Sequence, residues 1–140
     1  MRKKKDNTPK MKITTHICKT LDLGVSGNLF GGQLMYWLDE AASVYAIWAT
    51  GEKRIVTRRI SEVLFNKPIH TGELLIFNCV EPRRGKTSFS FKVLVVVGSE
   101  IRFQAECTFV AVDENGNKKE IDWSKAPISQ TGDMSSFPSE

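Results

Sequence analysis

Residues 27–50 form the one segment of this sequence with the periodicity of an amphipathic helix, and this feature constrains the fold most. The segment, GNLFGGQLMYWLDEAASVYAIWAT, predicts a helix over residues 30–50 that stops at Gly51. At about 100° per residue, large apolar side chains gather on one side: Phe30, Leu34, Trp37, Leu38, Ala41, Val44, Tyr45 and Trp48. A helix with so wide an apolar side must be covered by other elements of the chain.

Most of the remaining chain has the alternating pattern of strands. These segments are residues 13–19, 55–65, 74–81, 87–97 and 101–112. Turn residues separate them at 66–72, 82–85 and 98–100, and the short last connection makes the final pair antiparallel. One helix and about five to six antiparallel strands can bury their apolar sides only if the sheet curls around the helix. We therefore expect an α+β fold.

The length of 140 residues suits one domain with a sizeable core. We expect that domain to span residues 12–122, between a basic flexible tail at 1–11 and a C-terminal tail at 123–140. The net charge of +4 comes partly from a basic run at residues 2–5. We interpret this run as a solvated tail, because no motif that binds nucleic acid accompanies it.

The sequence also predicts the cellular location of the protein. Its basic start is not followed by the apolar run of a secretory signal, and Asp39 and Glu40 interrupt the longest apolar segment before it reaches the ~20 residues of a membrane helix. Cys18, Cys79 and Cys107 have neither disulfide nor metal-ligand spacing and are expected to be reduced core residues. We expect a cytoplasmic protein with no metal and no membrane span.

Asp39 lies on the side of the predicted helix opposite the large apolar residues. The residues that share its face are small or uncharged: Gly32, Met35, Tyr36, Ala42, Ser43, Ala46 and Thr50. A solvated face would carry lysines and glutamates there, so we expect another chain to pack on this face and to bury Asp39 in part. Such a carboxylate costs stability unless it is paired, which makes it a candidate for chemistry. Glu40, about 100° round the helix, can be an ordinary flanking acid.

Gly31 and Gly32 stand in the first turn of the helix. There they leave room for a carbonyl oxygen to approach unpaired backbone N–H groups and the positive end of the helix dipole, as in an oxyanion hole. The alternative, that glycines allow tight packing of the loop on the sheet, has equal weight. Asn28 adds an amide that can orient water or a carbonyl.

The spacing along the helix sets a further constraint. Asp39 follows Gly32 by seven residues, or about 10.5 Å of helix, too far for both to reach one reacting carbon. Two copies of the helix packed antiparallel about a two-fold axis would bring Asp39 of one beside Asn28 and Gly32 of the other.

Four stretches of the sequence resemble the hotdog-fold acyl-CoA thioesterases, particularly the bacterial cytosolic acyl-CoA hydrolases related to brain-type acyl-CoA hydrolase. They are GNLFGGQLMYWLDEAA, VLFNKPIHTGELL, RRGKTSFSFKV and ECTFVAVDENGNKKEI, and the resemblance runs from about residue 13 to 121. It implies a hotdog fold and hydrolysis of acyl-CoA to a free acid and CoA, as in fatty acid metabolism, without a metal. CoA enters as part of the substrate. The resemblance also implies homodimers, often arranged as a trimer of dimers.

By this resemblance, Asp39 matches the catalytic carboxylate, acting as general base on water or, alternatively, as nucleophile through an anhydride. Asn28 matches the residue that helps to hold water or thioester, and the Gly32 N–H, beside Gly31, matches the donor that polarises the carbonyl. A thioester suits this equipment because its carbonyl is electrophilic and its thiolate leaves readily.

The phosphates of CoA would need cations and hydrogen-bond donors. The candidates are Arg58 and the run Arg84, Gly85, Lys86, Thr87 and Ser88. The alternative for all of them is an ordinary basic turn or strand edge.

Two other functions stay open. A hotdog hydratase or dehydratase would need a catalytic histidine beside an acid, and we expect neither His16 nor His70 near the helix or a metal. A noncatalytic module that binds or senses acyl-CoA would keep the glycines and the cations but would not need Asp39.

Overall fold

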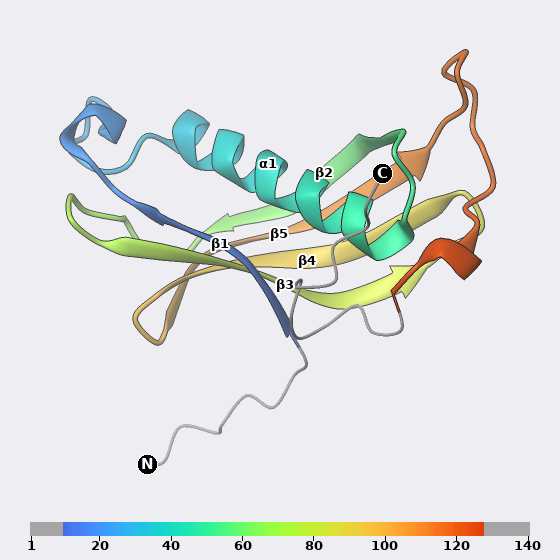
Figure 1. Cartoon of the computed structure of the whole chain (residues 1–140). Coiled ribbons are helices and arrows are strands. Elements are labelled where there is room, and N and C mark those ends of the chain that lie inside the picture. The colour runs from blue at the N-terminus through green and yellow to red at the C-terminus, as the bar shows by residue number, and fades with distance from the viewer. Residues whose placement is uncertain (1–9, 128–140) are drawn as a thin grey trace.

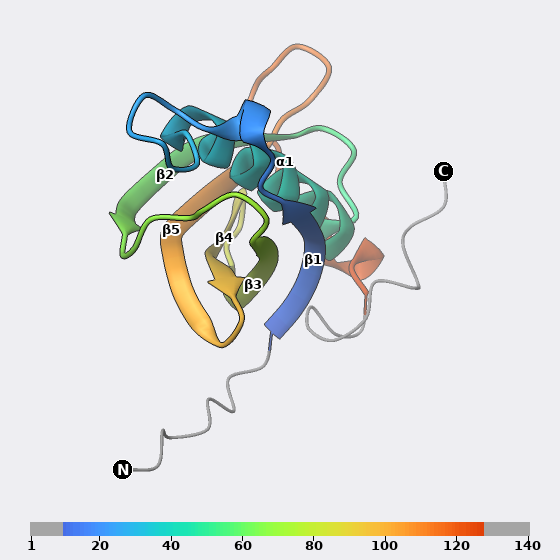
Figure 2. The same ribbon diagram turned by 90° about the vertical axis from the view of Figure 1, so that its left-hand side faces the viewer.

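The computed structural model describes residues 10–127. In this part of the chain, five strands form one antiparallel sheet in the order β1-β3-β4-β5-β2: β1 (Lys10–Ile17), β2 (Ile55–Phe65), β3 (Leu74–Arg84), β4 (Ser88–Val97) and β5 (Glu100–Ala111). The helix α1 (Gly31–Thr50) runs along the sheet (Figure 1), and the sheet curves around it in the end-on view (Figure 2). The predicted α+β arrangement is confirmed.

The core lies between the apolar side of α1 and the concave face of the sheet. Leu38, Tyr45 and Trp48 of the helix are fully buried, as are the inward aromatic residues of the strands, Phe77, Phe89, Phe91, Phe103 and Phe109. The Tyr45 ring meets Phe91 edge-on, with 4.8 Å between ring centroids. Phe30 differs from the prediction, because it precedes the first helical residue as N-cap and is 58% exposed.

Both ends of the domain extend further than the sequence suggested. β1 begins at Lys10 and Met11 is fully buried, so two residues of the expected tail at 1–11 belong to the sheet. Trp123, expected in the C-terminal tail, lies in the short 3₁₀ helix η2 (Trp123–Lys125) and donates Nε1–H to the Gly85 oxygen at 2.9 Å. Residues 1–9 and 128–140 of the two expected tails lie outside the described residues.

β3 continues through the turn that the sequence predicted at residues 82–85. A bulge at Glu81, which has a left-handed φ of 55°, shifts the register without ending the strand. Arg83 then pairs with Ser90 and Arg84 with Phe89. The two arginines therefore face opposite sides of the sheet, and a proline followed by two arginines was a poor indicator of a turn here.

Glu52 ties the loop after β5 to the end of α1. The helix stops at Gly51, whose φ of 72° is left-handed, and the next carboxylate, Glu52, is only 4% exposed. It accepts hydrogen bonds from Lys119 Nζ at 2.7 Å and from the Asp122 N–H at 3.1 Å. Burial alone would raise the pKa of Glu52, but these hydrogen bonds and the charge of Lys119 bring it below the ordinary value.

We expect Glu52→Gln to destabilise the fold by about 1–3 kcal/mol at pH 7, because Lys119 loses its charged partner. The pKa of Glu52 is lower in the folded chain than in the unfolded one, so its contribution is complete above the unfolded pKa and is lost as pH falls through the folded pKa. In thermal unfolding, the difference in Tm between the wild type and Glu52→Gln should begin to shrink near pH 4.5, the ordinary pKa of glutamate, and should disappear at lower pH. A gap that stays constant from pH 7 to about pH 3 would contradict this role.

Candidate functional site

The helix α1 begins at two glycines, each with an aromatic ring nearby. Phe30 provides no side-chain cap, and its oxygen accepts the hydrogen bond from the Leu34 N–H at 3.1 Å. The N–H groups of Gly31 and Gly32 come before that bond and have no acceptor within the helix. A Cβ on Gly32 would stand 2.6 Å from the Phe30 ring, whereas one on Gly31 would lie 3.6 Å from Phe65. A side chain at position 32 would therefore displace the exposed Phe30 ring, and glycine there leaves its N–H accessible.

Asp39 lies in the middle of α1 and is held by the sheet. Its Oδ1 accepts a hydrogen bond from Thr57 Oγ1 of β2 at 2.8 Å. Burial raises the pKa of Cys107 in β5 to about 12, and the charge of Asp39 contributes to this shift. Asp39 therefore belongs to the side of the helix that meets β2 and β5. Among the described residues, its Oδ2 has no hydrogen-bond partner.

Glu40, the neighbouring acid, influences a residue of β1 rather than of β2. Burial lowers the pKa of His16 in β1, and the charge of Glu40 opposes this shift. The His16 ring stacks on Trp37 of α1 with 4.5 Å between centroids, and its Nε2 is buried without a partner in the described part of the chain. The expectation that neither histidine lies near the helix was wrong for His16, because strand alternation alone does not show what a side chain meets. His70 is exposed in the turn before β3.

The face around Asp39 differs from the prediction in its C-terminal half. Ala42, Ala46 and Thr50 are fully buried within the chain itself. Asp39, which we expected to be partly buried, is exposed in the single chain, and Tyr36 is 65% exposed. β2 returns along α1, with Thr57 at Asp39 and Phe65 at Gly31, yet it leaves Asp39 and Tyr36 exposed. A partner chain can therefore cover the N-terminal half of the face alone.

Asn28 lies in the loop before α1, at the opposite end of the helix from Gly51. It lines a cavity of about 270 Å³ together with Leu34, Phe65 and Arg102. Asp39 does not line this cavity, and regular helix holds it about 10.5 Å beyond Gly32. Neither Gly31 nor Gly32 lines this cavity, so the single chain places Asn28 and the two glycines near the start of α1 without joining them in one pocket, and it leaves the carboxylate farther along the helix.

The candidate phosphate-binding residues also separate. Arg84 lies over the Trp123 ring, with its Cζ 4.7 Å from the centroid, and the turn from Gly85 to Ser88 is closed by a 2.8 Å bond from the Gly85 N–H to the Ser88 oxygen. A Cβ on Gly85 would stand 2.6 Å from Ser88 Oγ, so this turn needs glycine. Lys86 and Thr87 belong to the same turn. Arg58 instead stands at a bulge of β2 next to Thr57, away from this group.

Thr57 is the site residue that sequence reasoning missed. Its register partner is Phe109, whose side chain points to the helix, and Ile55 pairs likewise with the inward Ala111. The alternation of β2 therefore contained the information that Thr57 faces α1. A threonine in a strand is ordinary, however, and only the fold shows that it meets Asp39.

Metal sites, disulfides and membrane-spanning helices are not found among the described residues. Among residues 10–127, no group of three His, Cys, Asp or Glu side chains is placed to hold a metal ion. All three cysteines are free and buried. No helix in the described part of the chain is long and apolar enough to cross a membrane.

Comparison with known proteins places this geometry in context. The sequence profile of the thioesterase superfamily matches residues 26–109. The acyl-CoA thioester hydrolase YciA of Salmonella typhimurium is 27% identical over 126 residues, which cover 83% of this chain and 94% of that protein.

Two solved structures with similar folds add to this comparison. An acyl-CoA hydrolase from Staphylococcus aureus, in complex with butyryl-CoA and CoA, gives a TM-score of 0.71 at 28% identity, over 80% of this chain and 68% of that one. The same enzyme is known as variants in which one asparagine, one aspartate or one threonine is alanine. A hexameric, broad-specificity acyl-CoA thioesterase, solved as an aspartate-to-alanine variant, gives a TM-score of 0.72 at 27% identity, over 79% of this chain and 86% of that one.

Proposed function

The chain belongs to the thioesterase superfamily, and we propose that it hydrolyses acyl-CoA to a free carboxylic acid and CoA. The observation that carries the proposal is the hydrogen bond between Thr57 and Asp39 on a helix that begins with two uncapped glycines. In the S. aureus hydrolase, the aspartate and the threonine that were changed to alanine are 17 residues apart (60 − 43). Asp39 and Thr57 are 18 apart (57 − 39), a similar spacing, which supports a role for both residues here.

The case for Asn28 is different. The asparagine and aspartate that were changed in the S. aureus hydrolase are 15 residues apart (43 − 28), whereas Asn28 and Asp39 are 11 apart (39 − 28). Counting 15 residues back from Asp39 reaches Gly24. The role that we propose for Asn28, to orient water or the thioester, therefore rests on its place beside the helix start in this structure.

Hydrolysis needs a base for water and a donor for the carbonyl oxygen. In the proposed reaction, Oδ2 of Asp39 accepts a proton from the water that attacks the thioester carbon, while Thr57 holds Oδ1. The N–H of Gly32 donates to the carbonyl oxygen, where negative charge develops. The C–S bond then breaks, the CoA thiolate leaves, and the proton on Asp39 passes to the thiolate or to solvent. CoA is part of the substrate, so the scheme uses no resident cofactor.

We propose that two copies of the chain complete the site. β2 is an edge strand with β5 as its only neighbour among the five strands described, and an open edge invites pairing. Aromatic surface is exposed here, because Phe65 at the end of β2 is 60% exposed and Tyr36 in the N-terminal half of α1 is 65% exposed. Antiparallel packing of two such helices brings Asp39 of one copy toward Asn28 and Gly32 of its partner. Three dimers would form a hexamer, the state of the broad-specificity relative. A cytoplasmic location remains part of this proposal.

The test of the function is release of free thiol from a panel of acyl-CoA esters of different chain length. We expect turnover of at least one ester, and a parallel assay of enoyl-CoA absorbance covers the hydratase alternative. Hydration of the enoyl-CoA without thiol release would support the hydratase alternative, with His16 and the nearby charge of Glu40 as its candidate residues. Binding of CoA with neither reaction would make the chain a noncatalytic module.

Thr57→Val should lower kcat about tenfold with a smaller effect on KM, because it removes one hydrogen bond to a charged group and keeps the shape of the side chain. Thr57→Ser should restore most of the activity, since it keeps the hydroxyl. Thr108→Val is the matched control, because Thr108 bonds Ser90 and pairs with Arg59 and not with α1. Equal kcat for Thr57→Val and the wild type would remove Thr57 from the site.

A further inference from the structure

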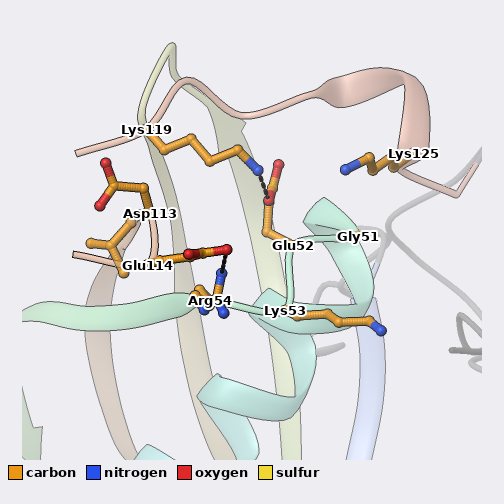
Figure 3. Close-up of a pocket in the computed structure, with 9 residues that line it drawn as sticks. Gly51, Glu52, Lys53, Arg54, Asp113, Glu114, Lys119 and Lys125 are labelled. Carbon is orange, nitrogen blue, oxygen red and sulfur yellow. Dashed lines mark hydrogen bonds and ion pairs between the residues drawn. The ribbon is translucent and has the colours of Figure 1, made fainter. Parts of the chain in front are cut away.

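A cavity of about 600 Å³ opens at the C-terminal end of α1 (Figure 3). Its wall comes from the loop between α1 and β2, the loop after β5 and η2. Charged side chains dominate this wall. The cations are Lys53, Arg54, Lys119 and Lys125, and the acids are Glu52, Asp113 and Glu114.

The acids of this cavity are largely engaged by the chain itself. Glu52 accepts hydrogen bonds from Lys119 Nζ and the Asp122 N–H, as described above. Oδ1 of Asp113 accepts the N–H groups of Asn115 and Asn117 at 2.9 and 3.0 Å. The remaining acid, Glu114, lies 4.0 Å from Arg54, and both side chains are exposed. An anionic ligand at Arg54 would therefore compete only with the weak surface pair to Glu114, and the other cations of the cavity would attract it as well.

The cations are arranged around the buried pair rather than scattered. Figure 3 shows the amino group of Lys125 directed toward Glu52 and Lys119, with Arg54 on the other side of Glu52. Within the described chain, Lys125 forms no ion pair within 4.0 Å, although its charge acts on Glu52. The Lys53 side chain extends away from this group. Arg54 and Lys125 are therefore the two cations best placed to hold an incoming anion.

We infer that this cavity binds the phosphates of the CoA substrate, an inference that rests on the proposed function. Arg54 precedes Thr57 by three residues, which span about 10 Å of extended chain at ~3.3 Å per residue, and Thr57 bonds Asp39. The pantetheine arm of CoA has about 13 bonds between sulfur and phosphorus, roughly 15 Å at the reach of a polypeptide backbone. A thioester at Asp39 can therefore place its pyrophosphate at Arg54.

The basic turn favoured by the sequence is less suited to this task. Arg83 faces the other side of the sheet, where it binds Glu106 through both carboxylate oxygens. Arg84 packs on Trp123, and Lys86 is the remaining cation of the turn. The turn lies close to the cavity, because the Ile121 N–H donates to the Lys86 oxygen and Lys125 packs against Gly51. The cavity is thus a neighbouring site, at which Arg54 and Lys125 are placed to hold an anion.

The test compares two substrates, an acyl-CoA and the matching acyl-pantetheine, which keeps the thioester and lacks the phosphates. We expect the double variant Arg54→Ala/Lys125→Ala to lower the ratio of their kcat/KM values about tenfold or more, mainly through KM for acyl-CoA. In the wild type, added salt should lower the same ratio, and the double variant should flatten this dependence. Lys12→Ala/Lys92→Ala, which removes two cations from the face of the sheet turned away from α1, is the matched control.

The outcomes separate the inference from the function on which it rests. If neither substrate is hydrolysed by the wild type, the proposed function fails. If both are hydrolysed and the ratio is the same in the wild type and the Arg54/Lys125 variant, the cavity does not bind the phosphates. If Arg84→Ala/Lys86→Ala lowers the ratio and the cavity variant does not, the phosphates bind at the basic turn instead. Circular dichroism of each variant confirms that it is folded.

Discussion

Asp39→Asn should abolish thioester hydrolysis while the chain still folds and binds CoA. The amide keeps the shape of the carboxylate and can accept the hydrogen bond from Thr57, but it does not take a proton from water. General-base catalysis contributes on the order of 10²-fold or more, so kcat for the best acyl-CoA should fall at least that far. The measurements are thiol release and, separately, CoA binding by calorimetry.

The neighbouring acid provides the control for this prediction. Glu40 is exposed, carries the same charge and acts on His16 rather than on the β2 side of the helix. Glu40→Gln should therefore leave kcat within about twofold of the wild type, because it changes the net charge of the helix without touching the proposed base. Turnover of Asp39→Asn within about threefold of the wild type would exclude Asp39 as the base.

Two inactive variants, Asn28→Ala and Asp39→Ala, should regain activity when they are unfolded together and reassembled. In a shared site, Asp39 of one copy works with Asn28 and Gly32 of its partner, so a mixed dimer holds one site with both residues intact and one with neither. Random pairing makes half of the dimers mixed, and about a quarter of the wild-type activity per subunit should return.

Each variant reassembled alone is the baseline for this experiment, and native mass spectrometry measures the fraction of mixed dimers. Mixed dimers without recovered activity would mean that each chain builds its own site. If Asn28→Ala alone retains full activity, Asn28 has no part in catalysis. The complementation would then be repeated with a substitution at Gly24, which has the spacing of the S. aureus asparagine.

The elements of this fold could be predicted because their signals are local. The apolar stripe over residues 30–50 and the alternation in residues 55–65 arise from the repeat of one helix or strand, and both match the observed bounds within one residue. The same local reading failed at residues 82–85, where a bulge at Glu81 lets β3 continue. A bulge depends on the partner strand, so it cannot be predicted from the residues of one segment alone.

The sequence by itself determined that a helix of this kind carries Asp39 seven residues after Gly32, and hence that one copy keeps them apart. Only the tertiary structure decided what surrounds them. The return of β2 brings Thr57 to Asp39, and in the folded chain Ala42 and Ala46 are buried while Tyr36 stays exposed. Likewise, Lys119 meets Glu52 across 67 residues of sequence. Contacts between distant segments depend on how the sheet curves around the helix, and the periodicity of each element carries no information about that curvature.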